Sequence, residues 1–276
     1  MKNVSITKAS GNQEIFSSEK LRHSLAKSGA NEITIDNILF EIESKLYEGI
    51  STKKIYQAAF ALLKKSNISH AGRYNLKRAI MALGPSGFPF EKYIAAIFDW
   101  QGYKTQTQLF LEGACVTHEI DVLAENETEF LLIECKYHNS VGVVSDVKIP
   151  LYIHSRYQDV LKNWSKTSTT KPLNCCLVTN TKFSSDAVKY GNCIGIKLLG
   201  WDYPTKKSLS KLIDKSGLYP ITCLTTLTNK EKENVLAAGV VLCSSLLQNE
   251  TLLSKVVIGQ SRITSIIAEI KSLCKY

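Results

Sequence analysis

Residues 84–89, Gly-Pro-Ser-Gly-Phe-Pro, place two prolines and two glycines within six positions, and neither a helix nor a strand can continue through them. The residues before this break have mostly helical patterns, with apolar side chains at helical spacing in the run from 50 to 66. After one further helical run, residues 90–102, the chain changes to strand-like runs at 104–113, 115–125 and 129–137. The break therefore predicts a change of architecture from a helical segment to a sheet.

The segment before the break also contains a short β-hairpin. Residues 4–8 and 14–16 alternate in polarity around the turn Ala-Ser-Gly-Asn-Gln. Ser and Gly residues at the ends of the runs that follow are typical helix boundaries. The predicted helices cover residues 17–29, 34–49, 50–66 and 69–83.

The rest of the chain divides into a sheet-containing segment and a helical one. After the three strand-like runs, we expect a helix at 146–166, a strand at 173–180, a helix at 183–192 and a strand at 193–201, which together predict one mixed sheet. From about residue 206, short helical patterns follow one another to the end of the sequence. The expected fold class is a multidomain α/β protein with segments 1–84, 85–205 and 206–276.

The composition excludes several classes of protein. Of the 276 residues, 44% are hydrophobic and 21% are charged, as in foldable globular chains. No apolar run approaches the ~18–20 residues that span a bilayer, and the first residues lack a secretory pattern, so we expect a cytosolic protein without membrane contact. The eight cysteines contain no Cys-x-x-Cys pair, which favours free thiols over a disulfide framework or a zinc site.

The net charge of +9 is distributed unevenly. Residues 1–84 have 13 Lys and Arg against 7 Asp and Glu, and residues 206–276 have 10 against 5, whereas the middle segment has 11 against 13. Basic flanks suit a polyphosphate or nucleic acid partner, and a mildly acidic centre suits a metal site built from carboxylates. The same distribution is also compatible with an ordinary solvated surface.

The most specific chemical pattern lies in residues 118–138. In a strand, side chains two positions apart share a face, so Glu119 pairs with Asp121 and Glu134 pairs with Lys136. The residues between the two strands form a hairpin turn, so both pairs can meet at one point. Asp121 and Glu134 could then hold Mg²⁺, or Mn²⁺, and Lys136 could orient a water molecule and stabilise developing negative charge.

The charged residues of this hairpin allow an extended metal site or a different interpretation. Glu91, early in the predicted helix 90–102, could reach the same site as an additional carboxylate. The charges could instead form the solvent face of an amphipathic hairpin whose other face, including Ile120, Val122, Ile133 and Cys135, is buried. The spacing of the residues alone favours the amphipathic hairpin.

Residues 88–138 resemble the Mrr-type branch of the PD-(D/E)XK restriction endonucleases. The resemblance rests on Phe90-Glu91, Gly102-Tyr103, Ile120-Asp121-Val122 and Glu134-x-Lys136. It implies a nuclease core in which Asp121 and Glu134 bind metal and Lys136 is the catalytic lysine. The sequence departs from many members, which have Gln in place of Glu134 and Gly in place of Glu119, and its His-Glu-Ile-Asp run is closer to resolvase-like relatives.

Residues 3–83 resemble an ATP-cone, the nucleotide-sensing domain of ribonucleotide reductases. The matching residues are Val4, Lys8, Gly11, Glu14, Phe16, Lys20 and Leu21, with Thr52, Ile55 and Tyr74 further along. The resemblance implies that Lys8 and Lys20 approach a nucleotide, with Gly11, Glu14 and Thr52 at the same site. Two ammonium groups beside a glycine turn and a helix N-terminus suit a triphosphate. A degenerate cone that serves only oligomer contacts is the alternative.

Residues 218–273 resemble, more loosely, the helix-hairpin-helix modules that bind DNA phosphates through backbone amides. The hairpin around Gly259 and Arg262 is the expected contact, although small helical bundles share the pattern.

Together these resemblances imply a Mg²⁺-dependent DNA endonuclease that is regulated by ATP or dATP, forms a homo-oligomer and serves prokaryotic or antiviral defence. A structure-selective repair or recombination nuclease is the first alternative. A nucleotide-responsive DNA-binding regulator without cleavage is the second.

Overall fold

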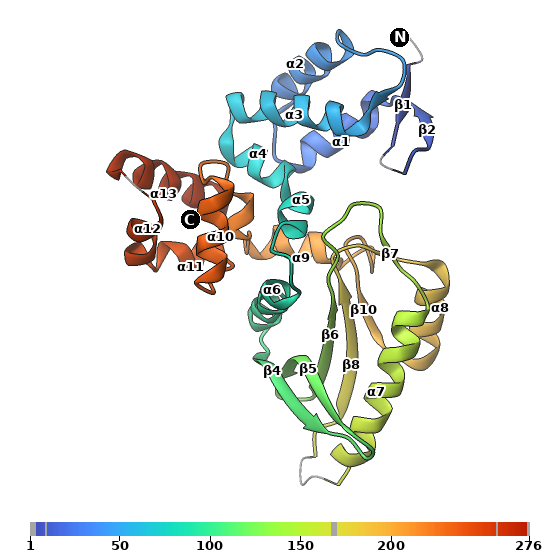
Figure 1. Cartoon of the computed structure of the whole chain (residues 1–276). Coiled ribbons are helices and arrows are strands. Elements are labelled where there is room, and N and C mark those ends of the chain that lie inside the picture. The colour runs from blue at the N-terminus through green and yellow to red at the C-terminus, as the bar shows by residue number, and fades with distance from the viewer. Residues whose placement is uncertain (1–3, 9, 167–169, 258, 275–276) are drawn as a thin grey trace. The chain divides into compact units, whose positions relative to one another are not determined.

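The computed structural model describes residues 4–8, 10–166, 170–257 and 259–274. It is a mixed α/β structure with three sheets (Figure 1). The chain forms two compact units, one made of Met1–Ala79 with Tyr219–Tyr276 and the other of Ile80–Leu218. Most of the first segment expected from the sequence, and most of the third, therefore lie in one unit, and residues 80–84 belong to the other. No helix among the described residues is long and apolar enough to cross a bilayer.

The first unit begins with the predicted hairpin. Strands β1 (Ser5–Thr7) and β2 (Gln13–Ile15) are antiparallel, and β3 (Ile50–Ser51) adds to β1 in parallel. A two-residue strand has no alternation to detect, which is why the sequence does not predict β3.

Four helices follow in this unit, and their starts obey the capping rules. The side chains of Ser17, Asn31, Ser51 and Asn67 each accept a hydrogen bond from a backbone amide in the first turn of the helix they precede. The helices are α1 (Ser18–Lys27), α2 (Glu32–Glu43), α3 (Thr52–Ser66) and α4 (Ile68–Tyr74). A further helix, α5 (Leu76–Met81), crosses the boundary between the units.

The C-terminal part of the first unit is helical, as predicted. The elements are the 3₁₀ turn η1 (Ile221–Cys223), α10 (Asn229–Ala237), α11 (Cys243–Leu247), α12 (Glu250–Val256) and α13 (Gln260–Cys274). All of these helices are short except α13, which has 15 residues. Buried Glu269 holds the turn before α10, because its carboxylate accepts the backbone amides of Thr225 and Thr226 at 2.7 and 2.9 Å.

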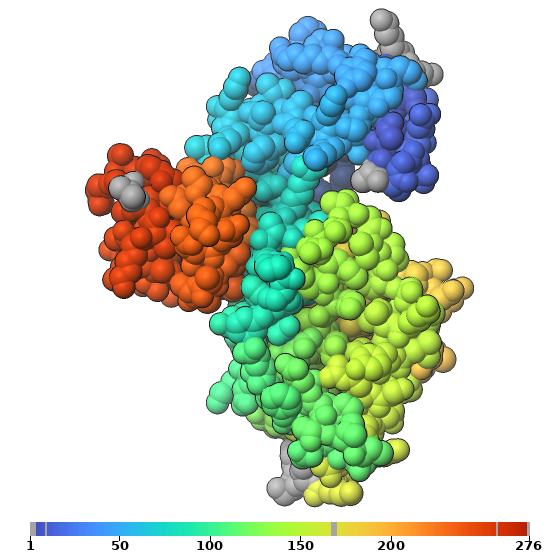
Figure 2. All heavy atoms as spheres, viewed as in Figure 1, coloured from blue at the N-terminus to red at the C-terminus, as the bar shows by residue number. Residues whose placement is uncertain are grey.

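Helix α13 packs on α4, far earlier in the chain. The Arg73 guanidinium donates to the carbonyl oxygens of Ser272 and Leu273, both at 3.1 Å, and so satisfies the end of α13. Gly72 allows the close approach, because a Cβ atom there would lie 3.2 Å from Cδ1 of Leu273. In Figure 2 the orange and red C-terminal atoms lie directly against the cyan atoms of this region.

The second unit is built on a five-stranded sheet of order β10-β8-β6-β5-β4. Its strands are β4 (Lys104–Glu112), β5 (Thr117–Glu125), β6 (Phe130–Lys136), β8 (Leu173–Thr179) and β10 (Lys197–Leu199). β4, β5 and β6 form an antiparallel meander, whereas β8 and β10 extend the sheet in parallel. Two short strands, β7 (Val144–Ser145) and β9 (Lys182–Phe183), pair separately and were not predicted.

Helices cover both faces of this sheet. Helix α6 (Phe88–Trp100) lies on one side, and α7 (Lys148–Trp164) with α8 (Ser185–Ile194) lies on the other (Figure 1). α9 (Leu209–Ser216) packs beside α6. Between the sheet and α7 the core contains Ile120, Leu132, Ile153 and Leu177, all at most 2% exposed. This layering places the middle of α7 over β5 and β6, where the predicted chemistry lies.

The packing of α13 on α4 gives a first prediction. Arg73→Met keeps the aliphatic stem but removes the donors to Ser272 and Leu273, and we expect the free energy of unfolding to fall by about 1.5–3 kcal/mol. Arg22→Met is the matched control, since Arg22 pairs with Glu32 and Asp36 at the surface, and it should cost less than about 1 kcal/mol. Urea denaturation of both variants measures the difference, and equal losses would contradict a structural role for Arg73.

Candidate nuclease centre and nucleotide pocket

Asp121 and Glu134 lie where strands β5 and β6 separate. The hydrogen-bonded register between these strands includes Val122 opposite Ile133, and Asp121 and Glu134 are the next residues on each strand. At that point the Asp121 Oδ2 atom, instead of a backbone carbonyl, accepts the amide of Cys135 at 2.7 Å. The two acidic side chains are thus neighbours at an opening in the ladder, as the sequence predicted.

The surroundings of Asp121 and Glu134 differ from the solvent face that the amphipathic-hairpin interpretation predicts. The Glu134 side chain is only 18% exposed, because α7 covers it, and Arg156 of that helix donates to Glu134 Oε2 at 2.8 Å. Arg156 also donates to the backbone carbonyl of Glu119 on β5. The expectation that these acids form a solvent face is therefore wrong for Glu134. The hydrophobic neighbours Ile120, Val122 and Ile133 are buried, as expected, and Cys135 is intermediate.

Burial and mutual repulsion raise the pKa values of three acids in this region. Burial raises the pKa of Glu134 to about 7, with a further rise from the charge of Asp121 and a partial offset from Arg156. Burial likewise raises the pKa of Glu91 to about 7, and the charges of Asp121 and Glu119 add to the effect. The pKa of Asp121 is raised mainly by burial, against the opposing effects of the Cys135 amide and Arg156. The three carboxyl groups therefore share one electrostatic environment.

The donor set suits a cation held by few protein ligands. Among the described residues, no three His, Cys, Asp or Glu side chains are grouped closely enough to hold a metal ion by themselves. Mg²⁺ commonly takes one or two carboxylates and completes its shell with water or phosphate oxygens. In the described part of the chain, Glu134 Oε1 and Asp121 Oδ1 form no hydrogen bond, so each acid retains an oxygen for such an ion. The residues present therefore fit a Mg²⁺ ion.

Lys136 stands at the end of β6, two residues beyond Glu134, and its side chain is exposed. Its charge lowers the pKa of Asp121, though it is the weakest of the influences on that group. Glu91 lies in the first turn of α6. The predicted residues Glu91, Asp121, Glu134 and Lys136 are thus brought to one region by α6, β5 and β6.

Arg156 is the residue of this region that the sequence did not identify. It lies in the predicted helix 146–166, and nothing in the local sequence links it to an acid 22 positions earlier. Asp159, one turn further along α7, does have a structural role: it accepts the amides of Cys115 and Val116 and contacts His118 at 2.9 Å. These bonds anchor the β4–β5 turn to α7.

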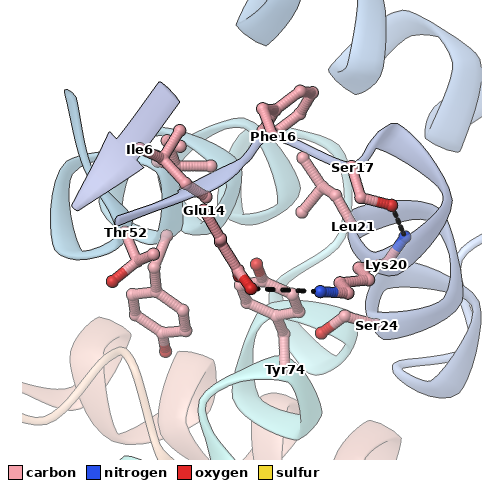
Figure 3. Close-up of a pocket in the computed structure, with 11 residues that line it drawn as sticks. Ile6, Glu14, Phe16, Ser17, Lys20, Leu21, Ser24, Thr52 and Tyr74 are labelled. Carbon is pink, nitrogen blue, oxygen red and sulfur yellow. Dashed lines mark hydrogen bonds and ion pairs between the residues drawn. The ribbon is translucent and has the colours of Figure 1, made fainter. Parts of the chain in front are cut away.

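A pocket in the first unit gathers most of the residues predicted to bind a nucleotide. It has a volume of about 190 Å³, and Glu14, Ser17, Lys20 and Thr52 are among its lining residues (Figure 3). Glu14 draws two lysines together, because its Oε2 lies 2.6 Å from Nζ of Lys8 and 3.3 Å from Nζ of Lys20. Gly11 has a φ of +83° in the hairpin turn and is not among the residues that line the pocket.

The opposite wall of this pocket is aromatic, which the sequence indicated only through Tyr74. The rings of Tyr56 and Tyr74 stack at a centroid distance of 5.0 Å, and the Arg78 guanidinium lies 3.5 Å from the centre of the Tyr56 ring. Burial raises the pKa of Tyr74 to about 12, so its hydroxyl is neutral at physiological pH. The pocket thus combines the Lys20 ammonium group with aromatic faces, and Lys8 reaches it only through Glu14 because it is not among the lining residues.

The predicted DNA contact in the C-terminal helices has a different environment from the expected one. Arg262 donates to the Glu231 carboxylate at 2.6 and 2.9 Å and to the carbonyl of Thr226 at 3.2 Å. This interaction lowers the pKa of Glu231 to about 2 and ties α13 to α10. Gly259, at φ +98°, directly precedes α13, and its carbonyl accepts the backbone amide of Arg262 at 3.2 Å. Within the protein, Arg262 has a structural role.

Fold and site together describe a mixed α/β chain with an acidic cluster in one unit and a lysine-bearing pocket in the other. The family model for the C-terminal region of AF1548-like proteins matches residues 219–274. An uncharacterized protein of Archaeoglobus fulgidus is 36% identical over 181 residues, which cover 65% of this chain and 99% of that protein. This chain belongs to the AF1548-like family.

One solved structure agrees with this assignment. The crystal structure of AF1548, a protein of unknown function, matches with a TM-score of 0.57 at 34% identity, over 69% of this chain and 99% of that one. Protein VC1899 from Vibrio cholerae matches with a TM-score of only 0.30 at 16% identity, over 72% of this chain and 51% of that one, which is too low to compare folds.

The raised pKa values give a second prediction. At pH 8 the ionised Asp121 repels Glu91 and Glu134, whereas near pH 5 the latter two are protonated and the repulsion is absent. A raised folded pKa means that stability is lost as pH rises toward that value. Asp121→Asn keeps an acceptor for the Cys135 amide, so we expect its melting temperature at pH 8 to exceed that of the wild type by about 2–4 °C.

The difference should vanish at pH 5, and Glu127→Gln, in the exposed β5–β6 turn, should show no such pH dependence. Differential scanning calorimetry of the three proteins at both pH values measures this. A lower melting temperature for Asp121→Asn at both pH values would mean that the carboxylate serves the fold.

Proposed function

We propose that this protein is a Mg²⁺-dependent DNA endonuclease whose activity is controlled by a purine nucleoside triphosphate bound to the first unit. The observation that carries the proposal is that the half-buried carboxyl groups of Glu91, Asp121 and Glu134 share one electrostatic environment, in which two of them have a pKa of about 7. A fold gains little from bringing like charges near one another and partly out of water, so this arrangement favours a functional site.

In this proposal Asp121 and Glu134 hold the metal. Bound Mg²⁺ would lower the pKa of a water molecule and offset the charge that develops on the phosphodiester. Arg156 fixes the orientation of the Glu134 carboxylate by donating to Oε2. The orientation of the other oxygen, Oε1, is fixed by the same ion pair. The Cys135 amide fixes Asp121 in the same way through Oδ2. Both carboxylates are therefore oriented before the metal ion binds, which lowers the reorganisation needed for catalysis.

Lys136 and Glu91 have the remaining roles. The exposed ammonium of Lys136 would orient the attacking water and stabilise negative charge on the phosphate. Glu91, with a pKa of about 7, can accept or release a proton near neutral pH. The ionisation of Glu91 and Glu134 near pH 7 also implies that metal binding strengthens between pH 6 and 8.

Cleavage is the third prediction. The full-length protein should nick or cut plasmid DNA with Mg²⁺ and not with EDTA, and Lys136→Ala should lower the rate by at least a hundredfold through the loss of charge stabilisation. Lys104→Ala, on the exposed edge strand β4, is the matched control and should cut normally. Agarose gels over a time course measure the rates. Cleavage that persists in EDTA, or a fully active Lys136→Ala protein, would refute the assignment.

The pocket of the first unit supports the nucleotide part of the proposal. A triphosphate would replace Glu14 as the partner of Lys8 and Lys20, next to the α1 N-terminus that Ser17 caps. The stacked rings of Tyr56 and Tyr74 offer an aromatic surface suited to a purine. The sequence has no Gly-x-x-x-x-Gly-Lys-Ser/Thr loop, so we expect sensing without rapid hydrolysis.

Control of the nuclease requires that the nucleotide prefers one conformational or oligomeric state, because equal affinity for two states would shift neither. We propose that the state preferred by the nucleotide is a homo-oligomer of this chain. We further propose that the protein acts in the cytosol in prokaryotic defence. A structure-selective repair or recombination nuclease would use the same centre.

Nucleotide binding is the fourth prediction. Isothermal titration of the wild type should detect binding of ATP or dATP, and the double variant Lys8→Ala, Lys20→Ala should bind at least tenfold more weakly, since two charge-assisted contacts are lost. The control is Lys27→Ala, Lys53→Ala, which removes two exposed lysines outside the pocket. Size-exclusion chromatography with each nucleotide measures assembly. The absence of binding heat in the wild type would rule out sensing.

One observation favours a second candidate, a nucleotide-responsive DNA-binding regulator without cleavage. Glu134 is already paired with Arg156, and the described residues contain no group of three metal-ligand side chains. Nucleotide binding with DNA binding and without cleavage under any metal would select this candidate.

A further inference from the structure

The second unit contains a basic pocket that none of the predicted sites includes. It has a volume of about 550 Å³, and its lining residues come from the end of α6 and from the region of α9. They include Trp100, Gln101, Lys206, Lys207, Lys211 and Lys215. No Asp or Glu lines it, and none of these four lysines forms an ion pair with a carboxylate within the described part of the chain. The pocket therefore presents uncompensated positive charge in a concave site.

The stability of helix α9 does not account for these four lysines. Leu209 and Ile213 are fully buried and attach one face of the helix to the core. Lys211 and Lys215 lie four residues apart on the other side. Lys215 is in the last turn, where the helix dipole favours a cation, but that effect does not account for Lys206, Lys207 and Lys211 in the same pocket. An anionic ligand accounts for all four.

Trp100 adds a feature that a simple anion site does not need. Its side chain is 41% exposed although it lines the pocket, and Nζ of Lys215 lies 5.8 Å from the ring centre. Cationic grooves with accessible aromatic rings are the common way to bind single-stranded nucleic acid, with phosphates on the lysines and a base on the ring.

We propose that this pocket binds a single-stranded segment of nucleic acid, with its phosphates on the four lysines and a base stacked on Trp100. The choice of nucleic acid as the polyanion rests on the proposed nuclease function. The pocket is distinct from the acidic cluster, because Trp100 follows Glu91 by nine residues on α6, which is about 14 Å along the helix and half a turn around it. The site would hold strand that flanks the cleaved phosphate.

The test measures binding without cleavage. Full-length protein in EDTA is titrated against a fluorescein-labelled 20-nucleotide oligothymidine, and anisotropy is followed from 50 to 250 mM KCl. The pocket variant carries Lys→Gln at the four lysines. The control variant carries the same charge change at four exposed lysines of the same unit outside the pocket, Lys104, Lys162, Lys166 and Lys189.

We expect the pocket variant to bind at least tenfold more weakly at 100 mM KCl, with a salt slope reduced by about 3, since each phosphate contact with single strands contributes about 0.7. The control variant should bind within about threefold of the wild type. Trp100→Phe should retain affinity but lose the quenching of tryptophan fluorescence on binding, and Trp100→Ala should bind about tenfold more weakly.

Three results would overturn the proposal: equal binding by the pocket and control variants, no effect of Trp100→Ala together with a preference for the matched duplex, or displacement by inorganic polyphosphate as effectively as by the oligonucleotide. Plasmid cleavage by the same proteins separates this inference from the nuclease assignment. If the protein binds the oligonucleotide through the pocket but never cuts plasmid, only the nuclease function is refuted. If it cuts plasmid but the pocket variant binds the oligonucleotide like the control variant, only the proposed binding site is refuted.

Discussion

The ion pair between Arg156 and Glu134 is the contact on which the arrangement of the second unit's acidic centre depends. It joins α7 to the central strand β6, and the bond from Arg156 to the Glu119 carbonyl extends the same contact to β5. A buried carboxylate beside Asp121 would otherwise be strongly unfavourable, because desolvation and like-charge repulsion act together. Arg156 offsets part of that cost without removing it, since the pKa of Glu134 remains near 7. The residual cost leaves the centre receptive to a further cation.

The layers around the sheet bring opposite charges to this contact. α6 contributes the Glu91 carboxyl group from one side of the sheet, and α7 contributes the Arg156 guanidinium from the other. β5 and β6 separate at Asp121, where a side-chain acceptor replaces the backbone one. Beyond that point β5 stays paired with β4 and β6 with β8, so the opening lies between the two strands that bear Asp121 and Glu134.

The first unit depends on contacts between the two ends of the chain. Arg73, on α4, satisfies the end of α13, and the next residue of α4, Tyr74, lines the pocket with Glu14 and Lys20. One short helix thus touches both the proposed sensor and the family's C-terminal region. A change at the pocket that moved α4 would be felt at α13, and this gives the proposed control a physical route within one unit.

The sequence by itself determined the local structure of this protein. Strand-like runs predicted strands at 104–113, 115–125, 129–137 and 173–180, and a Ser marked the start of the first helix, because periodicity and capping depend only on neighbouring residues. The juxtaposition of Asp121 and Glu134 also followed, since a hairpin fixes which residues lie opposite each other.

Only the tertiary structure decided what covers those acids and which distant segments meet. Arg156 reaches Glu134 across 22 positions, and Arg262 is engaged by Glu231 rather than exposed as a DNA contact. The lysines of α9 gather beside Trp100 although more than a hundred residues separate them in sequence. Such pairings depend on which faces pack together and on the charge left unpaired after packing, and neither quantity is written in a local pattern.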